Sequence, residues 1–101
     1  MNVDNRLDFS KSIEITSDSS ILDWFNEVMV LFNLVNKYDI KSVKGTVGES
    51  IISFDVEFNK LHEAKEASNI MVLNELTIYD ELYSLNNTRK RNTVNVSLLK
   101  L

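Results

Sequence analysis

The residues of this chain that could do chemistry are few and lie far apart. The chain has one histidine, His62, and no cysteine. Thiol catalysis, disulfide scaffolds and zinc sites built on thiolates are therefore excluded. The two glycines, Gly45 and Gly48, do not form a phosphate-binding loop of any known spacing. A mechanism or metal site that needs two histidines is excluded as well.

Two pairs of residues have spacings that could support acid–base chemistry. His62 and Glu66 are four residues apart on a predicted helix, so the carboxylate could hold the imidazole as a general base. Asp55 and Glu57 share one face of a predicted strand and lie about 7 Å apart by strand rise. Two carboxylates at this spacing could hold a divalent metal or act as an acid–base pair. Because no further ligand or nucleophile motif accompanies either pair, both are more typical of solvated faces. We predict a non-enzymatic protein without cofactor or metal.

One basic cluster, Arg89-Lys90-Arg91, stands apart from an acidic chain. Residues 1–86 carry seven basic and fifteen acidic side chains, a formal charge of −8, whereas residues 87–101 carry four basic side chains and no acidic one. The cluster is typical of a solvated loop before an edge strand. It could also contact a phosphate or an acidic patch, and this charge separation would suit self-association.

Alternating and amphipathic segments must position these residues. Alternation of apolar and polar residues predicts strands, here over Leu7–Thr16, Ile40–Val47, Ser50–Phe58 and Asn92–Leu101. Spacing at 3.6 residues predicts helices, here over Ile21–Tyr38 and Lys60–Leu85. We expect Gly48 to take a positive φ in the hairpin turn, Gly45 to form a bulge, and Asn59 to cap the second helix.

The second predicted helix has an alternative, because residues 70–79 could instead form short strands. Glu75, Asp80 and Glu81 are poor strand residues, so the helix is favoured. The resulting order is βαββαβ over a single domain, residues 1–101. This order predicts an α+β fold with a four-stranded antiparallel sheet and two helices on one face, a ferredoxin-like arrangement. Such a widely used fold implies no function by itself.

The predicted open face of the sheet is acidic and carries no aromatic residue. Its acidic side chains are Asp8, Glu14, Asp55 and Glu57. RNA-recognition domains stack bases on aromatic residues of this face, and phosphate binding needs positive potential. We therefore do not expect nucleic acid there. We expect the acidic side chains to engage a basic surface of a partner protein.

The first predicted helix carries more apolar residues than one buried face requires. The surplus residues are Leu22, Met29, Val30 and Leu34. They could be scattered exposed residues, or they could form a surface for self-association. We expect a homodimer with two-fold symmetry.

No segment is apolar enough to serve for export or membrane insertion. The longest apolar run, Val28–Phe32, is five residues, far short of the roughly 20 that span a bilayer. Residues Met1–Phe9 include two aspartates and lack a continuous apolar stretch, so we expect a cytoplasmic protein. Twelve Asn and eight Ile against two Ala indicate an AT-rich genome, such as that of a low-GC bacterium, its phage or a mobile element.

Three functions remain open on the sequence. The leading hypothesis is a small acidic protein that acts by binding another protein, as an inhibitor, adaptor or regulator. The alternative is a nucleic-acid-binding accessory protein that uses Arg89, Lys90 and Arg91. A regulatory domain that binds a small molecule is the second alternative. It is disfavoured because the turn over Ser17–Ser20 has no glycine.

Overall fold

The structure is a computed structural model that describes residues 14–15, 20–72 and 74–101. In this part of the chain two helices accompany six strands. The elements are β1 (Glu14–Ile15), α2 (Ser20–Leu31), β2 (Ile40–Val47), β3 (Ile51–Phe58), α3 (Leu61–Ile70), β4 (Asn74–Ile78), β5 (Glu81–Lys90) and β6 (Thr93–Lys100). Neither of these helices is long and apolar enough to cross a membrane.

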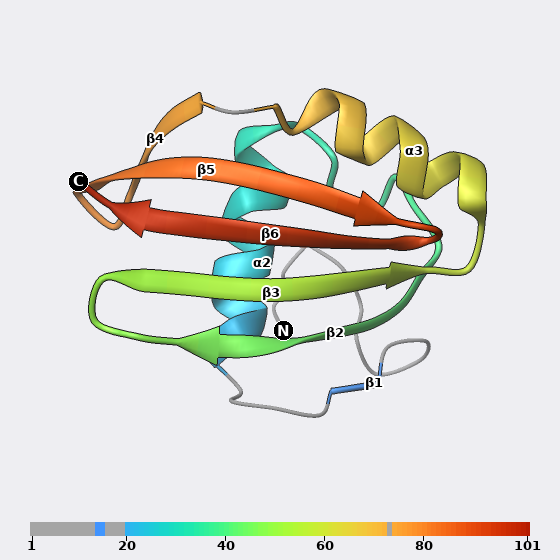
Figure 1. The fold of residues 1–101 in the computed structure, drawn as a ribbon, viewed down its shortest axis with the longest axis horizontal. Coiled ribbons are helices and arrows are strands. Elements are labelled where there is room, and N and C mark those ends of the chain that lie inside the picture. The colour runs from blue at the N-terminus through green and yellow to red at the C-terminus, as the bar shows by residue number, and fades with distance from the viewer. Residues whose placement is uncertain (1–13, 16–19, 73) are drawn as a thin grey trace.

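All six strands belong to one sheet with the order β1-β2-β3-β6-β5-β4 (Figure 1). The short β1 pairs with β2 in parallel, and every other neighbouring pair is antiparallel. Helix α2 passes behind the sheet in Figure 1, and α3 runs alongside β5 near one end of it. The expected class, α+β, is therefore correct, but the four-stranded ferredoxin-like sheet is wrong.

The error lies in the second predicted helix, which was expected to reach Leu85. It ends at Ile70, and β4 and β5 follow as a hairpin. Tyr79 and Asp80 form its two-residue turn, both with positive φ (52° and 64°), as a tight hairpin turn requires. The alternative of short strands within residues 70–79 is thus correct for Asn74–Ile78, whereas Ile70 is the last residue of α3. Burial of Ile78 on the inner face outweighs the low strand propensity of the acidic residues.

Packing against α2 explains why this hairpin forms. The Trp24 ring makes edge contacts with Tyr79 and Tyr83, at centroid distances of 5.2 and 5.4 Å. Such aromatic pairs contribute about 0.5–1.5 kcal/mol beyond the area that they bury. The contact joins residues more than fifty positions apart, so no local pattern signals it.

Helix α2 also ends earlier than its periodicity predicts, at Leu31 rather than Tyr38. Asn33 takes the left-handed conformation (φ 60°), its N–H donates to the Val30 carbonyl, and the Leu34 N–H donates to the Met29 carbonyl at 2.7 Å. This is a Schellman C-cap, in which the residue after the cap packs on the last turn. Met29 and Leu34 are accordingly both buried.

The core fills the space between the two helices and the inner face of the sheet. Phe25 of α2 meets Phe54 of β3 edge to face, with ring centroids 6.0 Å apart. Helix α3 contributes the small buried residues Ala64 and Ala67. The inner apolar side chains of the two central strands are all buried: Ile52, Phe54, Val56 and Phe58 from β3, and Val94, Val96 and Leu98 from β6.

The β2–β3 hairpin has the expected position but not the expected glycine geometry. Neither glycine has a positive φ, and the register shift lies between Ile40 and Ser42 rather than at Gly45. Gly45 instead lies directly opposite Phe54, where an added Cβ would stand 2.6 Å from the Phe54 Cα. The glycine is needed because the two strands and the Phe54 side chain leave no room for a larger residue.

Side-chain amides anchor α3 to the rest of the fold. Lys60, not Asn59, is the N-cap residue, and it forms no capping bond through its side chain. Asn59 donates instead to the Asp39 carboxylate at 3.0 Å. At the other end of α3, Asn87 of β5 donates to the carbonyl oxygens of Ser68 and Met71, and it accepts a bond from the Ser68 hydroxyl at 2.8 Å.

We predict that Gly45→Ala lowers the free energy of unfolding by about 2 kcal/mol or more, because the new methyl group forces strands apart in a packed region. Gly48→Ala is the matched control, since its Cβ would stand 3.0 Å from the Ile51 carbonyl oxygen and 3.8 Å from the Ile51 Cγ2. Urea denaturation of both variants provides the measurement. Equal losses for the two glycines would contradict this role of Gly45.

We also predict that Asn87→Asp destabilises the protein by about 1–3 kcal/mol, because the donor to two helix-terminal carbonyls is replaced by a negative charge. Asn86→Asp is the control, because Asn86 is exposed and lies on the other face of the same strand. Hydrogen exchange of the last turn of α3 should rise in the Asn87 variant alone. Unchanged exchange would show that the amide does not hold the helix.

Candidate binding surfaces

The outer face of the sheet is polar along the described strands β2, β3, β5 and β6, and Asp55 and Glu57 lie on it. Both described helices pack on the inner face, so Figure 1 looks onto a sheet surface that neither of them covers. The polar side chains of this outer face alternate with the buried ones along each strand: Lys44, Thr46, Ser53, Asp55, Glu57, Ser84, Asn86, Thr88, Thr93, Asn95 and Ser97.

A hydrogen-bond network centred on Asn95 occupies the middle of the outer face. The Asn95 amide donates to an Asp55 carboxylate oxygen at 2.8 Å and to the Ser53 hydroxyl at 3.2 Å. The Ser97 hydroxyl donates to the Asn95 side-chain oxygen at 3.2 Å. These bonds hold the side chains of β3 and β6 in place across the strands.

The four predicted acidic residues do not form a continuous acidic patch among the described residues. Asp8 lies outside the described residues, and of Glu14 only the backbone is described, in β1. Asp55 lies opposite Lys44 in the register. Glu57 accepts from the Ser42 hydroxyl at 3.3 Å and lies 3.7 Å from the Lys41 ammonium group. The charge of Glu57 is therefore offset by Lys41, and the Asp55 carboxylate is held by the Asn95 amide at 2.8 Å.

Neither pair that was considered for acid–base chemistry is arranged for it. Asp55 and Glu57 have separate partners, and the described residues contain no cluster of three or more His, Cys, Asp or Glu side chains able to hold a metal. Glu66 does not orient His62, because it accepts from the Tyr38 hydroxyl at 2.8 Å and lies 3.2 Å from the Lys37 ammonium group.

The Tyr38–Glu66 bond ties α3 to the segment between α2 and β2. The hydrogen bond from Tyr38, followed by the bond from Lys37, lowers the pKa of Glu66. Burial of the ring, together with the same bond, raises the pKa of Tyr38. The ring packs edge to face on Phe58, at a centroid distance of 5.6 Å. The role of this pair is thus structural.

An apolar patch lies on the outer face at the end where the β2–β3 and β4–β5 turns meet. It consists of Ile51, Leu82, Leu99 and Leu101, whose exposed fractions are 44–60%. Ile51 and Leu99 are direct neighbours in the register, and the Leu101 N–H donates to the Leu82 carbonyl at 2.9 Å. The signal in the sequence was the pair of apolar doublets Ile51-Ile52 and Leu98-Leu99, which place apolar side chains on both faces of a strand.

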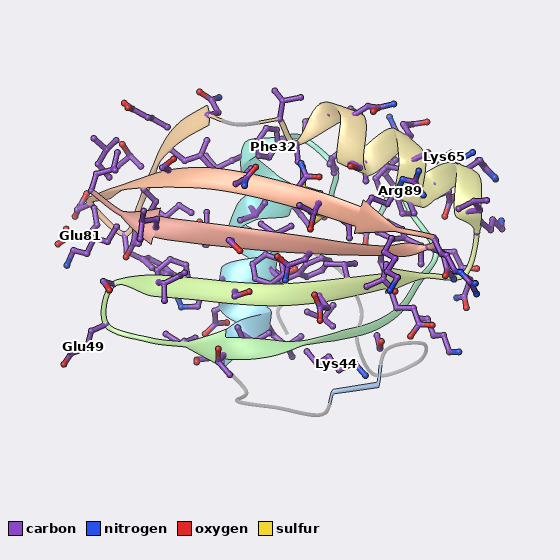
Figure 2. All side chains as sticks on the ribbon, viewed as in Figure 1. Phe32, Lys44, Glu49, Lys65, Glu81 and Arg89 are labelled. Carbon is purple, nitrogen blue, oxygen red and sulfur yellow. The ribbon has the colours of Figure 1, made fainter. Side chains whose placement is uncertain are left out.

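Acidic side chains border this apolar patch. Figure 2 shows Glu49 and Glu81 at the same end of the molecule, next to the β2–β3 and β4–β5 turns. Glu49 precedes Ile51 by two residues, and Glu81 directly precedes Leu82. The ammonium group of Lys100 lies 3.5 Å from the Glu81 carboxylate.

The surface predicted for self-association on α2 is smaller than expected. Met29 and Leu34 are buried, only 2% and 3% exposed, because the helix cap turns both into the core. Leu22 is partly buried against the core. Only Val30 of the four is exposed, beside Leu31.

The basic cluster lies at the opposite end of the sheet, where Arg89 and Lys90 end β5 and Arg91 begins the turn to β6. Arg91 has a positive φ (57°), and the Arg89 guanidinium donates to its carbonyl oxygen at 2.7 Å. Two hollows meet at this turn. The outer one, about 830 Å³, is lined by Asp55, Thr88, Arg89, Lys90, Arg91, Asn92, Thr93 and Asn95. The inner one, about 590 Å³, is lined by Asn59, Leu61, Lys65, Arg89, Arg91 and Asn92.

We predict that stability falls on acidification partly through Glu66. A carboxylate with a lowered pKa contributes stability above its unfolded-state pKa and loses it as the pH falls through the folded-state pKa. Tyr38→Phe removes the main cause of this shift, so the loss between about pH 6 and pH 3 should become smaller. Urea denaturation across this range measures it, with Tyr83→Phe as control. An unchanged pH dependence in Tyr38→Phe would contradict the assignment.

Comparison with known proteins does not assign the chain to a family. No family model matches it, and no curated protein and no solved structure shows significant similarity to it.

Proposed function

We propose that the protein is a non-catalytic binding protein and that the apolar patch on the outer face is where it contacts another protein. The observation that carries this proposal is the exposure of four large apolar side chains, side by side, on a sheet face that neither described helix covers. Contiguous apolar surface of this kind usually marks an interaction site, whereas single exposed apolar residues need no explanation.

The surroundings of the patch indicate the chemistry of the partner. Protein interfaces combine an apolar centre with a polar rim, and complementary charges in the rim steer association. Here the rim includes the carboxylate of Glu49, whereas the Glu81 carboxylate is paired with the Lys100 ammonium group at 3.5 Å. The partner that fits is a protein surface with an apolar centre and a basic residue opposite Glu49. By binding such a surface, the protein would act as an inhibitor, adaptor or regulator of its partner.

A second copy of the chain is the competing occupant of the patch. In a two-fold dimer the same surface meets itself, so the Glu49 carboxylates of the two copies would be brought toward each other. Like charges brought together across an interface oppose association. A homodimer therefore remains a prediction, but a basic partner fits the apolar patch better than a second copy does.

The experiment is site-directed cross-linking followed by a binding measurement. A photo-reactive residue at Leu99 should capture one protein from a lysate of the source cells, and the purified partner should then bind in a titration. Leu82→Ser with Leu99→Ser should weaken binding by about tenfold or more, equivalent to about 1.4 kcal/mol. Binding should also weaken as the salt concentration rises.

Val30→Ser with Leu31→Ser is the matched control, because both residues are similarly exposed but lie on α2. This control should bind as the unmodified protein does. Equal weakening by both double variants, or cross-links formed only between copies of the chain, would overturn the proposal.

A further inference from the structure

The inner hollow lies at the end of the sheet opposite the apolar patch, between α3 and the β5–β6 turn. Figure 2 shows Lys65 on α3 and Arg89 on β5 close to each other at this end. Arg91 completes a set of three cationic side chains around one hollow, and none of its six lining residues is acidic. The sequence places Lys65 more than twenty residues from the arginines, so only the fold brings the three together.

Within the described part of the chain these three cations have no carboxylate as an ion-pair partner, although Asp55 lines the outer hollow that Arg89 and Arg91 also line. The acidic residue in contact with the lining, Asp39, accepts a bond from Asn59 and does not itself line the hollow. Like charges that share a hollow repel one another, and a bound anion would relieve this repulsion.

The donors around the hollow suit an oxyanion with several oxygen atoms. An Arg guanidinium has five N–H donors, and a single bond from Arg89 to the Arg91 carbonyl leaves most of them available. Arginine matches phosphate with paired donors, and lysine adds a point charge. Asn92 is held by a bond from its amide to the Phe58 carbonyl at 2.6 Å, which places the turn firmly against β3.

The size and lining of the hollow indicate a ligand larger than the anion alone. Its volume of about 590 Å³ falls within the range of small-molecule sites, roughly 300–1,000 Å³. Leu61 lines it and is 48% exposed, so apolar surface stands beside the cations. Bases of a nucleic acid would need aromatic side chains on which to stack, and the lining offers none.

We propose that this hollow binds the phosphate group of a small organic phosphate, with Lys65, Arg89 and Arg91 contacting the phosphate and Leu61 contacting the organic part. The site is separate from the apolar patch and goes beyond the proposed protein binding. It extends the predicted Arg89-Lys90-Arg91 contact by adding Lys65 and Leu61, and it leaves out Lys90, which lines only the outer hollow of the two.

The test uses phenyl phosphate and inorganic phosphate as probes in a titration followed by NMR of the full chain. Both should bind, and phenyl phosphate should bind more tightly because its ring contacts Leu61. Shifts should centre on residues 59–65 and 89–92. The thermal midpoint should rise with ligand, because binding to the folded state stabilises it.

Arg89→Gln with Lys65→Gln should weaken phosphate binding by about tenfold or more. Lys44→Gln with Lys90→Gln is the matched control, because it removes the same charge outside the hollow, and it should change affinity little. Leu61→Ser should reduce affinity for phenyl phosphate but not for inorganic phosphate. Leu82→Ser with Leu99→Ser should leave phosphate binding intact, so this proposal and the proposed protein binding can fail separately.

Two results would overturn the proposal. One is an equal loss of phosphate affinity in the Lys65/Arg89 double variant and in the Lys44/Lys90 double variant. Such a result would indicate that the overall positive charge, not this hollow, attracts phosphate. The other is the absence of saturable phosphate binding, whether or not an oligonucleotide binds to the basic turn with strong salt dependence.

Discussion

The packing of the inner sides of β3 and β6 against the two helices is the constraint on which the rest of the structure depends. These two strands occupy the middle of the sheet, and all their inner apolar side chains are buried. At about 25 cal/mol per Å² of apolar area, each such side chain contributes about 1.5–3 kcal/mol. The strands β2 and β3 approach each other so closely that a Cβ at Gly45 would meet the Ser53 carbonyl oxygen and the Phe54 Cα, and the buried side of α3 is formed by the small residues Ala64 and Ala67.

The two faces of the sheet differ in what covers them, and its two ends differ in the side chains that they expose. The helices take the inner face, so the polar network around Asn95 stays on the outer face. The β2–β3 and β4–β5 turns place the apolar patch, Glu49 and the Glu81–Lys100 ion pair at one end, and the β5–β6 turn places the arginines at the other. The two proposed binding regions are therefore separated by the length of the strands.

Amide side chains decide where α3 lies, and with it the inner hollow. Asn87 binds the carbonyl oxygens at one end of this helix, Asn59 binds Asp39 near the other, and the Tyr38–Glu66 bond holds it from the side. Lys65 reaches the same hollow as Arg89 and Arg91 only because α3 is held along β5. Hydrogen bonds between distant residues, rather than local periodicity, thus assemble the proposed phosphate site.

The sequence by itself determined the α+β class, the β2–β3 hairpin, the last strand and the start of α2, because alternation and helical periodicity are local consequences of one-sided burial. It also singled out the basic turn. Tertiary structure decided that residues 74–78 form a strand, because packing on Trp24 and pairing with β5 outweigh weak local propensity. It likewise decided that Leu34 is buried and that Lys65 joins the arginines, because contacts between residues distant in the sequence leave no periodic trace.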